Sequence, residues 1–388
     1  MAKAKDKGDG FVLDPNISIA ERRKLGSAAA AKAILSKYGE NTISAGDDKR
    51  FVTARRIPTG SFMLDYALNG GWPRGRVNMV WGDRSAGKTT LMLKMIAAVQ
   101  KMDALTNKFI WEIPEEEHEN IVPFEITYLD VEGAYDAGWA KRLGVNTETL
   151  KVARPASAEE TGDVAQAILE SGSCDILVID SIAAQAPKDE ANADQENWQQ
   201  GLAARLNNKM FRKFNRAQNK INKLDEGSLT PTIFLINQER LKIGLMFGDP
   251  RVKPGGKAQD FVTSAEIHVW GNKVEYYDEK EKQIPKQTSF SFKVKKLKVG
   301  PPGIEGEYTM AISDDPDGNF VVGDVIEDSL VLDFAERVKI LEKVSATEWK
   351  MYDEKFKRKK DLEEAYVNNK DKFLALKRDI LARLCPHQ

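Results

Sequence analysis

Short apolar runs alternate with helical stretches along the middle of the chain. The first four runs are β-rich, almost continuously apolar, and separated by helical stretches. They lie at residues 77–81, 125–131, 175–180 and 232–237. Strands of this kind are typical of a parallel sheet covered by helices on both faces. Two later runs, at residues 265–270 and 289–299, follow one another without long helices, so they predict an antiparallel extension of the sheet.

The two ends of the chain have a different pattern. Residues 17–38 are rich in alanine and predict a helix with a weak apolar face, which a polar linker separates from the core. From about residue 328 the chain predicts helices again, and residues 336–388 carry 14 Lys and Arg against 10 Asp and Glu. We therefore expect an α/β fold in three parts. They are a start with an N-terminal helix (1–52), a core with a mostly parallel central sheet (53–325) and a small C-terminal helical domain (326–388).

Composition narrows the class of protein. The chain has 388 residues, of which 41% are hydrophobic and 30% charged, enough for a sizeable core. Its two cysteines, Cys174 and Cys385, exclude a disulfide framework and a cysteine-based zinc site. No apolar run approaches the ~20 residues that span a bilayer, and the start lacks the apolar segment of a signal peptide, so we expect a cytoplasmic protein with no membrane partner. The net charge is -1, so any nucleic-acid site must be local.

The clearest motif is GDRSAGKTT at residues 82–90, which matches the phosphate-loop pattern G-x-x-x-x-G-K-[ST] in full. It follows a predicted strand and precedes a helical run, whereas a simple glycine turn needs no such context. Backbone N–H groups and the helix terminus would hold phosphate oxygens. Lys88 would reach the β and γ phosphates, and the Thr89 hydroxyl would bind Mg²⁺. The predicted ATP-binding residues are Gly82, Asp83, Arg84, Ser85, Ala86, Gly87, Lys88, Thr89 and Thr90.

Polar residues end three other predicted strands. Asp180 follows an apolar run, as expected of the acidic residue that helps to hold Mg²⁺ beside a phosphate loop. Asp130 and Glu132 lie at the end of another run, where ligands of parallel sheets bind, and either could orient or deprotonate water. The residues alone leave this choice undecided. Gln238 could sense a γ-phosphate or merely cap its strand.

Several long strings resemble the RecA recombinase family. The string IPTGSFMLDYALNGGWPRGRVNMVWGDRSAGKTT is similar to the start of the RecA core, and LDVEGAYDAGWAKRLGV to the segment that carries its catalytic glutamate. VIDSIAAQAPKDE with GLAARL, and INQERLKIGLMFGDPRVKPGGKAQDF, resemble the two DNA-binding loop regions and their supports. The resemblance covers about residues 22–384. It implies a RecA-like P-loop ATPase core, an N-terminal helix that docks on the next protomer and a C-terminal helical domain.

The resemblance also assigns roles near the nucleotide. Glu132 would be the general base for water, and Gln238 the γ-phosphate sensor that communicates with DNA. Lys296 and Lys298 match lysines that reach the ATP of the neighbouring subunit, although a cluster of this kind also occurs on solvated strand edges. Asp136 and Trp139 match positions that flank the adenine.

Two loops would bind DNA according to the same resemblance. The first spans about residues 189–200 and is acidic and polar. The second spans about residues 239–257 and combines basic residues, apolar wedges and Gly/Pro breakers, which suits a site that holds phosphates and inserts between bases. The bland alternative is a solvated surface loop. The residues assigned to DNA binding are Trp198, Arg205, Arg240, Lys242, Met246, Phe247, Arg251, Lys253, Gly255 and Gly256.

The function implied is a DNA-dependent ATPase that forms filaments on single-stranded DNA. It would pair this strand with homologous double-stranded DNA and exchange strands in recombinational repair and the SOS response, with ATP and Mg²⁺ as cofactors. Head-to-tail self-association would place ATP between subunits, with Phe261 at the interface. We weigh two alternatives: an accessory paralogue that only remodels another recombinase, and a ring helicase or clock-type ATPase. The complete set of catalytic residues argues against an accessory paralogue. The sequence of the second DNA loop argues against a ring helicase or clock-type ATPase.

The chain departs from the family pattern in four places. Arg84 stands where an acidic residue is common, and Trp198 is unusual in the first loop. Residues 106–123, called the insertion below, are acidic, contain two prolines and predict a surface segment with no family equivalent. The chain stops at Gln388, where many relatives carry an acidic tail, so we expect a weaker restraint on duplex entry.

Overall fold

The computed structural model describes residues 18–38, 43, 55–184, 202–224, 230–241, 251–278, 280, 284–345 and 347–385. The chain divides into two units, Met1–Val52 and Thr53–Gln388. Helix α1 (Ile19–Tyr38) is the described element of the first unit. The Oγ of Ser18 accepts a hydrogen bond from the backbone N of Glu21, whose carboxylate accepts one from the backbone N of Ser18, so this reciprocal pair caps the helix. None of the residues of α1 is buried in the described part of the chain.

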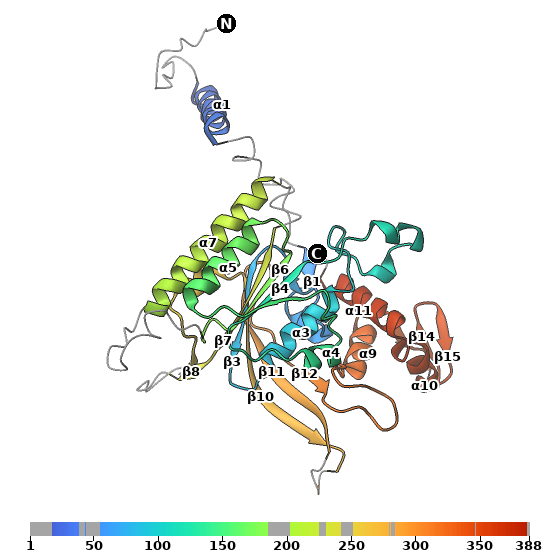
Figure 1. Cartoon of the computed structure of the whole chain (residues 1–388). Coiled ribbons are helices and arrows are strands. Elements are labelled where there is room, and N and C mark those ends of the chain that lie inside the picture. The colour runs from blue at the N-terminus through green and yellow to red at the C-terminus, as the bar shows by residue number, and fades with distance from the viewer. Residues whose placement is uncertain are drawn as a thin grey trace, which may run out of the picture. The chain divides into compact units, whose positions relative to one another are not determined.

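A sheet of eight strands forms the centre of the second unit (Figure 1). Its order is β12-β11-β10-β3-β7-β6-β4-β5. The strands from β10 to β5 pair in parallel, and β11 and β12 extend the β10 edge as antiparallel neighbours. Both the parallel core and the antiparallel extension agree with the sequence prediction. The strands are β3 (Val77–Gly82), β4 (Ile126–Asp130), β5 (Lys151–Ala153), β6 (Ile176–Asp180), β7 (Thr232–Gln238), β10 (Ala265–Tyr276), β11 (Pro285–Leu297) and β12 (Glu305–Ala311).

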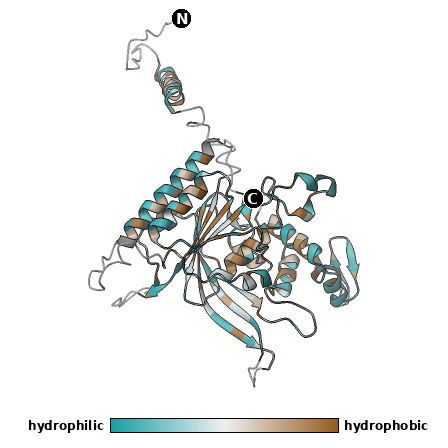
Figure 2. Ribbon diagram, in the orientation of Figure 1, coloured by the Kyte–Doolittle hydropathy of each residue, from teal (hydrophilic) through white to brown (hydrophobic). Residues whose placement is uncertain are grey.

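Helices cover both faces of this sheet because its inner strands are apolar on both sides. In β6, Ile176 and Val178 pack in the cluster of α3 (Lys88–Val99), whereas Leu177 and Ile179 pack in that of α5 (Ala158–Glu170) and α7 (Leu202–Leu224). Figure 2 shows apolar residues along the central strands and polar residues on much of α5 and α7. Strand ends are thereby fixed between two helical layers, and the loops that follow them meet at one edge.

The insertion lies on the surface, as predicted, and has its own short helices. They are η2 (Ile110–Glu112) and η3 (Glu115–Asn120), both of the 3-10 type. Phe109 anchors the segment in the main core, with an exposed fraction of 9%. The carboxylate of Asp103 closes the base of the insertion, since it accepts hydrogen bonds from the backbone N of Thr106 at 2.7 Å and of Val122 at 2.8 Å. The insertion is therefore attached firmly at its base.

The C-terminal region contains the predicted helices and also a small antiparallel sheet. Its strands, β13 (Leu341–Lys343), β14 (Trp349–Met351) and β15 (Glu354–Phe356), have three residues each. The helices are α9 (Asp328–Arg337), α10 (Lys359–Leu362), the π-helical turn η4 (Glu363–Val367) and α11 (Lys370–Leu384). They share a hydrophobic cluster with Phe62 of α2 (Phe62–Ala67). The domain boundary near residue 325 stays a prediction, since Thr53–Gln388 form one unit.

Two pairs of short strands and two short helices complete the described part of the second unit. Strands β1 (Arg56–Ile57) and β2 (Trp72–Pro73) pair with each other, as do β8 (Arg240–Leu241) and β9 (Arg251–Val252). Helices α4 (Ala137–Arg142) and α8 (Ala258–Val262) follow β4 and β9 in the chain. Within the described ranges, no helix combines the length and apolar character needed to cross a membrane.

Candidate functional site

The loop between β3 and α3 has a backbone that requires glycine at both ends. Gly82 pairs with Val269 of β10 and Gln238 of β7, and a Cβ atom on it would lie 1.8 Å from the carbonyl oxygen of Val269. Gly87 has a φ of 73° and caps α3, and a Cβ atom there would lie 2.9 Å from the Phe290 ring. Only glycine fits both positions. The predicted strand–loop–helix arrangement is therefore present, with the N-terminus of α3 at the loop.

Lys88 is the first residue of α3 and turns back over this loop. Its Nζ donates hydrogen bonds to the carbonyl oxygens of Gly82 at 3.2 Å and Asp83 at 2.5 Å. Burial lowers the pKa of Lys88, and the nearby Asp180 and Glu132 carboxylates oppose that shift. The ammonium faces a cavity of about 480 Å³ that the loop lines. The other lining residues are Arg84, Ser85, Ala86, Gly87, Thr89, Thr90, Glu132, Asp180, Gln238 and Phe290.

Two oxygen-bearing side chains from different elements meet beside Lys88. The Thr89 Oγ1 of α3 donates a hydrogen bond to the Asp180 Oδ2 at the end of β6, at 2.7 Å. Tyr128 of β4 donates to the same oxygen at 2.5 Å. Burial raises the pKa of Asp180, and these two hydrogen bonds oppose the shift. Hydroxyl and carboxylate oxygens are the ligands that Mg²⁺ prefers, so the pair fits this ion.

The structure separates the two acidic residues between which the sequence left the choice open. Strand β4 ends at Asp130, whose buried carboxylate accepts hydrogen bonds from Arg154 Nε at 2.8 Å and from the backbone N of Ala134 at 2.9 Å. Glu132 lies beyond the strand end, is exposed, and lines the cavity. The alternation of side chains along a strand therefore does not apply to this pair, because Glu132 is no longer part of the strand.

Two neutral donors converge on the Glu132 carboxylate. Gln238 Nε2 donates to Glu132 Oε1 at 2.5 Å, and the Ser181 hydroxyl donates to the same oxygen. Sequence reasoning gave Gln238 a place here but assigned no role to Ser181 or Tyr128. The available signals were weak: Ser181 follows Asp180 directly, and Tyr128 is a hydroxyl-bearing residue inside an apolar strand.

Asp136 and Trp139 lie at the start of α4, after Glu132. Asp136 caps the helix, since its Oδ1 accepts a hydrogen bond from the backbone N of Trp139 at 2.5 Å. Trp139 is half-buried and packs against the main core. Neither residue is among those that line the 480 Å³ cavity. The structure therefore places them at the N-terminus and in the first turn of α4, which follows Glu132 in the chain.

Lys296 and Lys298 lie at the end of β11 and contact α8. Lys296 Nζ donates to the carbonyl oxygen of Asp260, and Lys298 Nζ donates to that of Phe261 at 3.0 Å. Burial lowers the pKa of Lys296, and Lys298 adds to the shift. Neither lysine lines the cavity of its own chain. The Phe261 side chain beside them has an exposed fraction of 79%.

The residues expected to bind DNA are placed in two different ways. Arg240 and Arg251 are exposed on the β8–β9 hairpin, and Arg205 is exposed on α7. Lys253 instead points inward, where its Nζ lies 2.7 Å from Asp260 Oδ1 and 2.5 Å from Glu266 Oε2. Four predicted residues, Trp198, Lys242, Met246 and Phe247, lie outside the described residues.

The two glycines of the predicted second DNA loop pack against α7. Gly255 has a φ of 98° and Gly256 one of 84°. A Cβ atom would lie 2.6 Å from Asn207 Nδ2 at Gly255 and 2.9 Å from Ala204 Cβ at Gly256. The carbonyl oxygen of Gly255 also accepts a hydrogen bond from Asn207 Nδ2 at 3.5 Å. The end of this loop is thus held closely on the helix.

Comparison with known proteins gives one consistent family. The sequence model of the RecA N-terminal domain matches residues 26–314. Protein RecA of Ruminococcus albus is 34% identical over 338 residues, which cover 87% of this chain and 76% of that protein. Protein RecA of Bacillus subtilis is 34% identical over 309 residues, 79% of each chain. Protein RecA of Helicobacter hepaticus is 32% identical over 337 residues, 86% of this chain and 85% of that one.

Proposed function

The chain belongs to the RecA family of ATP-hydrolysing DNA recombinases, and we propose that the residues at the ends of β3, β4, β6 and β7 form its ATPase site. As a member of this family it uses ATP and Mg²⁺, binds single- and double-stranded DNA, and self-associates into filaments. It catalyses homologous pairing and strand exchange in recombinational repair. The convergence of Lys88, Asp180 and Glu132 on one cavity is the observation that supports the site.

Residues 82–90 would hold the triphosphate of ATP. The backbone N–H groups of the loop and the N-terminus of α3 supply donors for phosphate oxygens, and Lys88 supplies a fixed positive charge. Thr89 and Asp180 would hold Mg²⁺, which neutralises developing phosphate charge when bound. Tyr128 would position Asp180, because burial raises the pKa of Tyr128 and keeps its hydroxyl a donor. Asp136 and Trp139, at the start of α4, would flank the adenine.

Glu132 would orient the attacking water and accept its proton. It is the carboxylate of this pair that faces the cavity, whereas Asp130 is occupied by Arg154. Gln238 would connect the nucleotide to DNA. Its side chain contacts Glu132, and the backbone N of the next residue, Glu239, donates to the carbonyl oxygen of Gly82 at 2.8 Å. The strand that leads into the second DNA loop is therefore hydrogen-bonded to the phosphate loop.

The second DNA loop would hold phosphates through the exposed Arg240 and Arg251. Arg205 on α7, which follows the first loop in the sequence, would also bind DNA. Lys242, Met246, Phe247 and Trp198 are proposed to bind DNA from the sequence alone. Gly255 and Gly256 would support the loop by close packing on α7. Lys253 would act through its ion pairs with Asp260 and Glu266, at the base of the loop.

Filament contacts would involve α1, α8 and the end of β11. Lys296 and Lys298 would approach the ATP of a neighbouring subunit, and the exposed Phe261 would lie in the same interface. Helix α1 would dock on the next protomer, consistent with the absence of buried residues along it. We place the protein in the cytoplasm, and we propose the three-part division at residues 52 and 325.

Hydrolysis of ATP with and without single-stranded DNA tests this proposal, with Lys88→Ala as the comparison. We expect strong stimulation by DNA and a loss of about 100-fold or more in Lys88→Ala, because the γ-phosphate loses its fixed charge. Activity of Lys88→Ala near the unmodified rate would contradict the phosphate-loop assignment. Hydrolysis indifferent to DNA would contradict the proposed link through Gln238 and would favour an accessory paralogue.

A further inference from the structure

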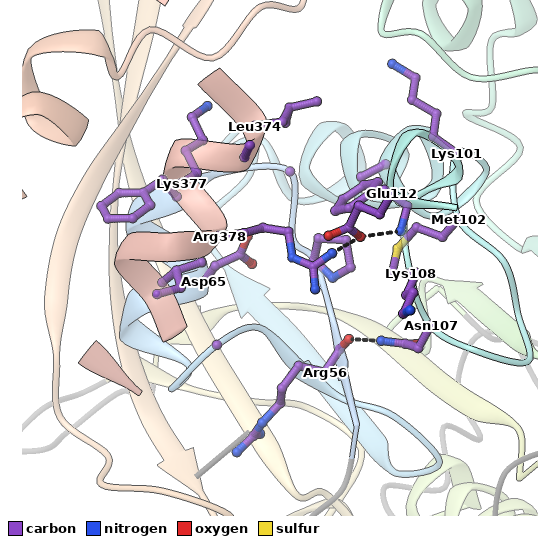
Figure 3. Close-up of a pocket in the computed structure, with 18 of the residues that line it drawn as sticks. Arg56, Asp65, Lys101, Met102, Asn107, Lys108, Glu112, Leu374, Lys377 and Arg378 are labelled. Carbon is purple, nitrogen blue, oxygen red and sulfur yellow. Dashed lines mark hydrogen bonds and ion pairs between the residues drawn. The ribbon is translucent and has the colours of Figure 1, made fainter. Parts of the chain in front are cut away.

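A second and larger cavity lies in the same unit, away from the ATPase site. It has a volume of about 720 Å³ and lies between α3, the insertion and α11. Figure 3 shows α11, with Lys377 and Arg378, across from the insertion, with Lys108 and Glu112, and the Arg378–Glu112 ion pair between them. Seven cationic and four acidic side chains line this space, which we call the basic cavity. Its volume is in the range of small-molecule sites, roughly 300–1,000 Å³.

Every acidic side chain in the basic cavity already has a partner. Glu327 forms an ion pair with Lys377 at 2.6 Å, and Glu112 forms one with Arg378. Asp65 accepts a hydrogen bond from the backbone N of Thr59 at 2.7 Å. Asp379 accepts one from the Tyr352 hydroxyl at 2.6 Å. Lys377 and Arg378 are thereby paired, whereas Asp65 and Asp379 form no ion pair with a cation of the cavity among the described residues.

Five cations that line the basic cavity have no carboxylate partner among the described residues. One of them, Arg56, is buried and donates a hydrogen bond to the carbonyl oxygen of Val299 at 2.9 Å. Lys94 Nζ reaches only the carbonyl oxygen of Leu143, at 3.5 Å, and Arg55 only that of Leu105, at 2.5 Å. The ammonium groups of Lys101 and Lys108 have no hydrogen bond or ion pair within the described ranges. Arg55, Lys101 and Lys108 are exposed at the rim, whereas Lys94 is half-buried. The basic cavity therefore has an excess of positive charge.

Lys94 is the lysine of this group whose positive charge is most disfavoured by burial. Burial lowers its pKa to about 8, and the nearby Lys101 and Lys377 oppose the Asp324 and Glu327 carboxylates that would raise it. Burial also raises the pKa of Asp65 to about 8, so this acid contributes little negative charge near neutral pH. An anion placed beside Lys94 would stabilise its charged form.

One wall of the basic cavity is aromatic. The rings of Phe109 and Trp111 stack with centroids 5.8 Å apart and an interplanar angle of 16°. Phe109 is buried, while Trp111 has an exposed fraction of 37% and makes no other ring contact with the described residues. Trp111 lines the basic cavity and is partly exposed, so its ring is available to stack on a planar ligand.

We propose that the basic cavity binds a nucleoside phosphate, with its base on Trp111 and its phosphate between Lys94 and the rim lysines Lys101 and Lys108. This site is separate from the phosphate loop, although both use α3: Lys88 begins the helix, and Lys94 and Lys101 lie along and just beyond it. The proposal goes beyond the ATPase function, because that function requires no second ligand.

Calorimetric titration with AMP tests the proposal on the full chain. The Lys88→Ala variant serves as the background, so that binding at the phosphate loop is weakened. We expect one equivalent of AMP to bind, and we expect Lys94→Gln in this background to weaken binding by about tenfold or more, the effect of losing one hydrogen bond to a charged group. Lys220→Gln, which changes an exposed lysine of α7, is the matched control and should leave the affinity unchanged.

A second variant guards against misfolding of the half-buried Lys94 site. The double variant Lys101→Gln with Lys108→Gln changes only exposed rim residues, so it should fold normally and still weaken AMP binding several-fold. Lack of AMP binding in the Lys88→Ala background would overturn the site. So would an affinity in the Lys94→Gln and double variants that is unchanged from that background. Inorganic phosphate or an acidic peptide binding as tightly as AMP would overturn the nucleoside class.

Discussion

The cavity of about 480 Å³ at the phosphate loop, called the ATPase cavity below, differs from the basic cavity in how its positive and negative charges are paired. In the first, Lys88 donates to backbone carbonyl oxygens, Asp180 accepts from Thr89, and Glu132 accepts from Gln238, so cation and acids line one cavity. In the second, two acids pair with cations, and five lining cations have no carboxylate partner among the described residues. A matched arrangement is suited to positioning groups for a reaction, whereas an unmatched one is suited to holding a ligand of opposite charge.

The largest effect on ATP hydrolysis should come from changing Glu132, the proposed base. Glu132→Gln removes the proposed base without changing its size, so we expect ATP hydrolysis to fall by about 10²–10⁴-fold while ATP binding is retained. Asp130→Asn is the matched control, because Asp130 is buried against Arg154 and does not face the cavity. DNA-stimulated hydrolysis and nucleotide binding should be measured on both. A larger loss of turnover in Asp130→Asn would reverse the assignment.

A smaller effect is expected at Tyr128, which contacts Asp180 from behind. Tyr128→Phe removes only the hydroxyl, so Asp180 loses a hydrogen bond that fixes its orientation. We expect the Mg²⁺ concentration for half-maximal nucleotide binding to rise by about tenfold. Tyr135→Phe is the control, because its ring lies 5.6 Å from that of Tyr128. An unchanged Mg²⁺ requirement in Tyr128→Phe would remove Tyr128 from the site.

The pH dependence of AMP binding should separate the two cavities further. Lys94 has a pKa of about 8, so its charge is present below that pH and is lost as the pH rises through it. Asp65, also with a pKa of about 8, gains negative charge over the same range. Both changes disfavour an anion, so affinity at the basic cavity should fall above pH 8 by up to about tenfold per pH unit. Titrations at pH 7 and 9 on the Lys88→Ala background measure this, and a constant affinity would contradict a role for Lys94.

The smallest effect is expected from the ion pair that crosses the basic cavity. Glu112→Gln releases Arg378, whose side chain then adds to the excess of positive charge. We expect AMP to bind about two- to threefold more tightly and the stability of the chain to change by less than about 1 kcal/mol, because the pair is partly exposed. Calorimetry and thermal unfolding test both parts. Weaker AMP binding in this variant would show that Arg378 is not available to the ligand.

The sequence predicted those structural features that are determined by residues close together in the chain. The strands of the central sheet, the phosphate loop and the antiparallel extension follow from local patterns, and the structure confirms them. The three-residue strands of the C-terminal region were not predicted, because a run that short has no detectable period. The basic cavity also has no sequence signature. Its side chains come from β1, α3, the insertion and α11, which only the fold brings together.

The choice between Asp130 and Glu132 depended on where β4 ends. If β4 continued through Glu132, the two carboxylates would share a face, and sequence patterns do not fix strand ends this closely. The inward turn of Lys253 was hidden for a different reason. Its partners Asp260 and Glu266 lie farther along the chain, so the loop composition alone suggested a solvent-facing cation.

In the proposed mechanism, the two hydrogen bonds on Glu132 would slow hydrolysis. One Glu132 oxygen already accepts hydrogen bonds from Gln238 and Ser181, so it would have to give one up before it could accept a proton from water. A lone subunit should therefore consume ATP slowly. Gln238 directly precedes the proposed second DNA loop. A rearrangement of that loop that withdraws the Gln238 amide would therefore free Glu132 to accept a proton. ATP hydrolysis would then depend on filament assembly on DNA, and subunits that are not bound to DNA would hydrolyse little ATP.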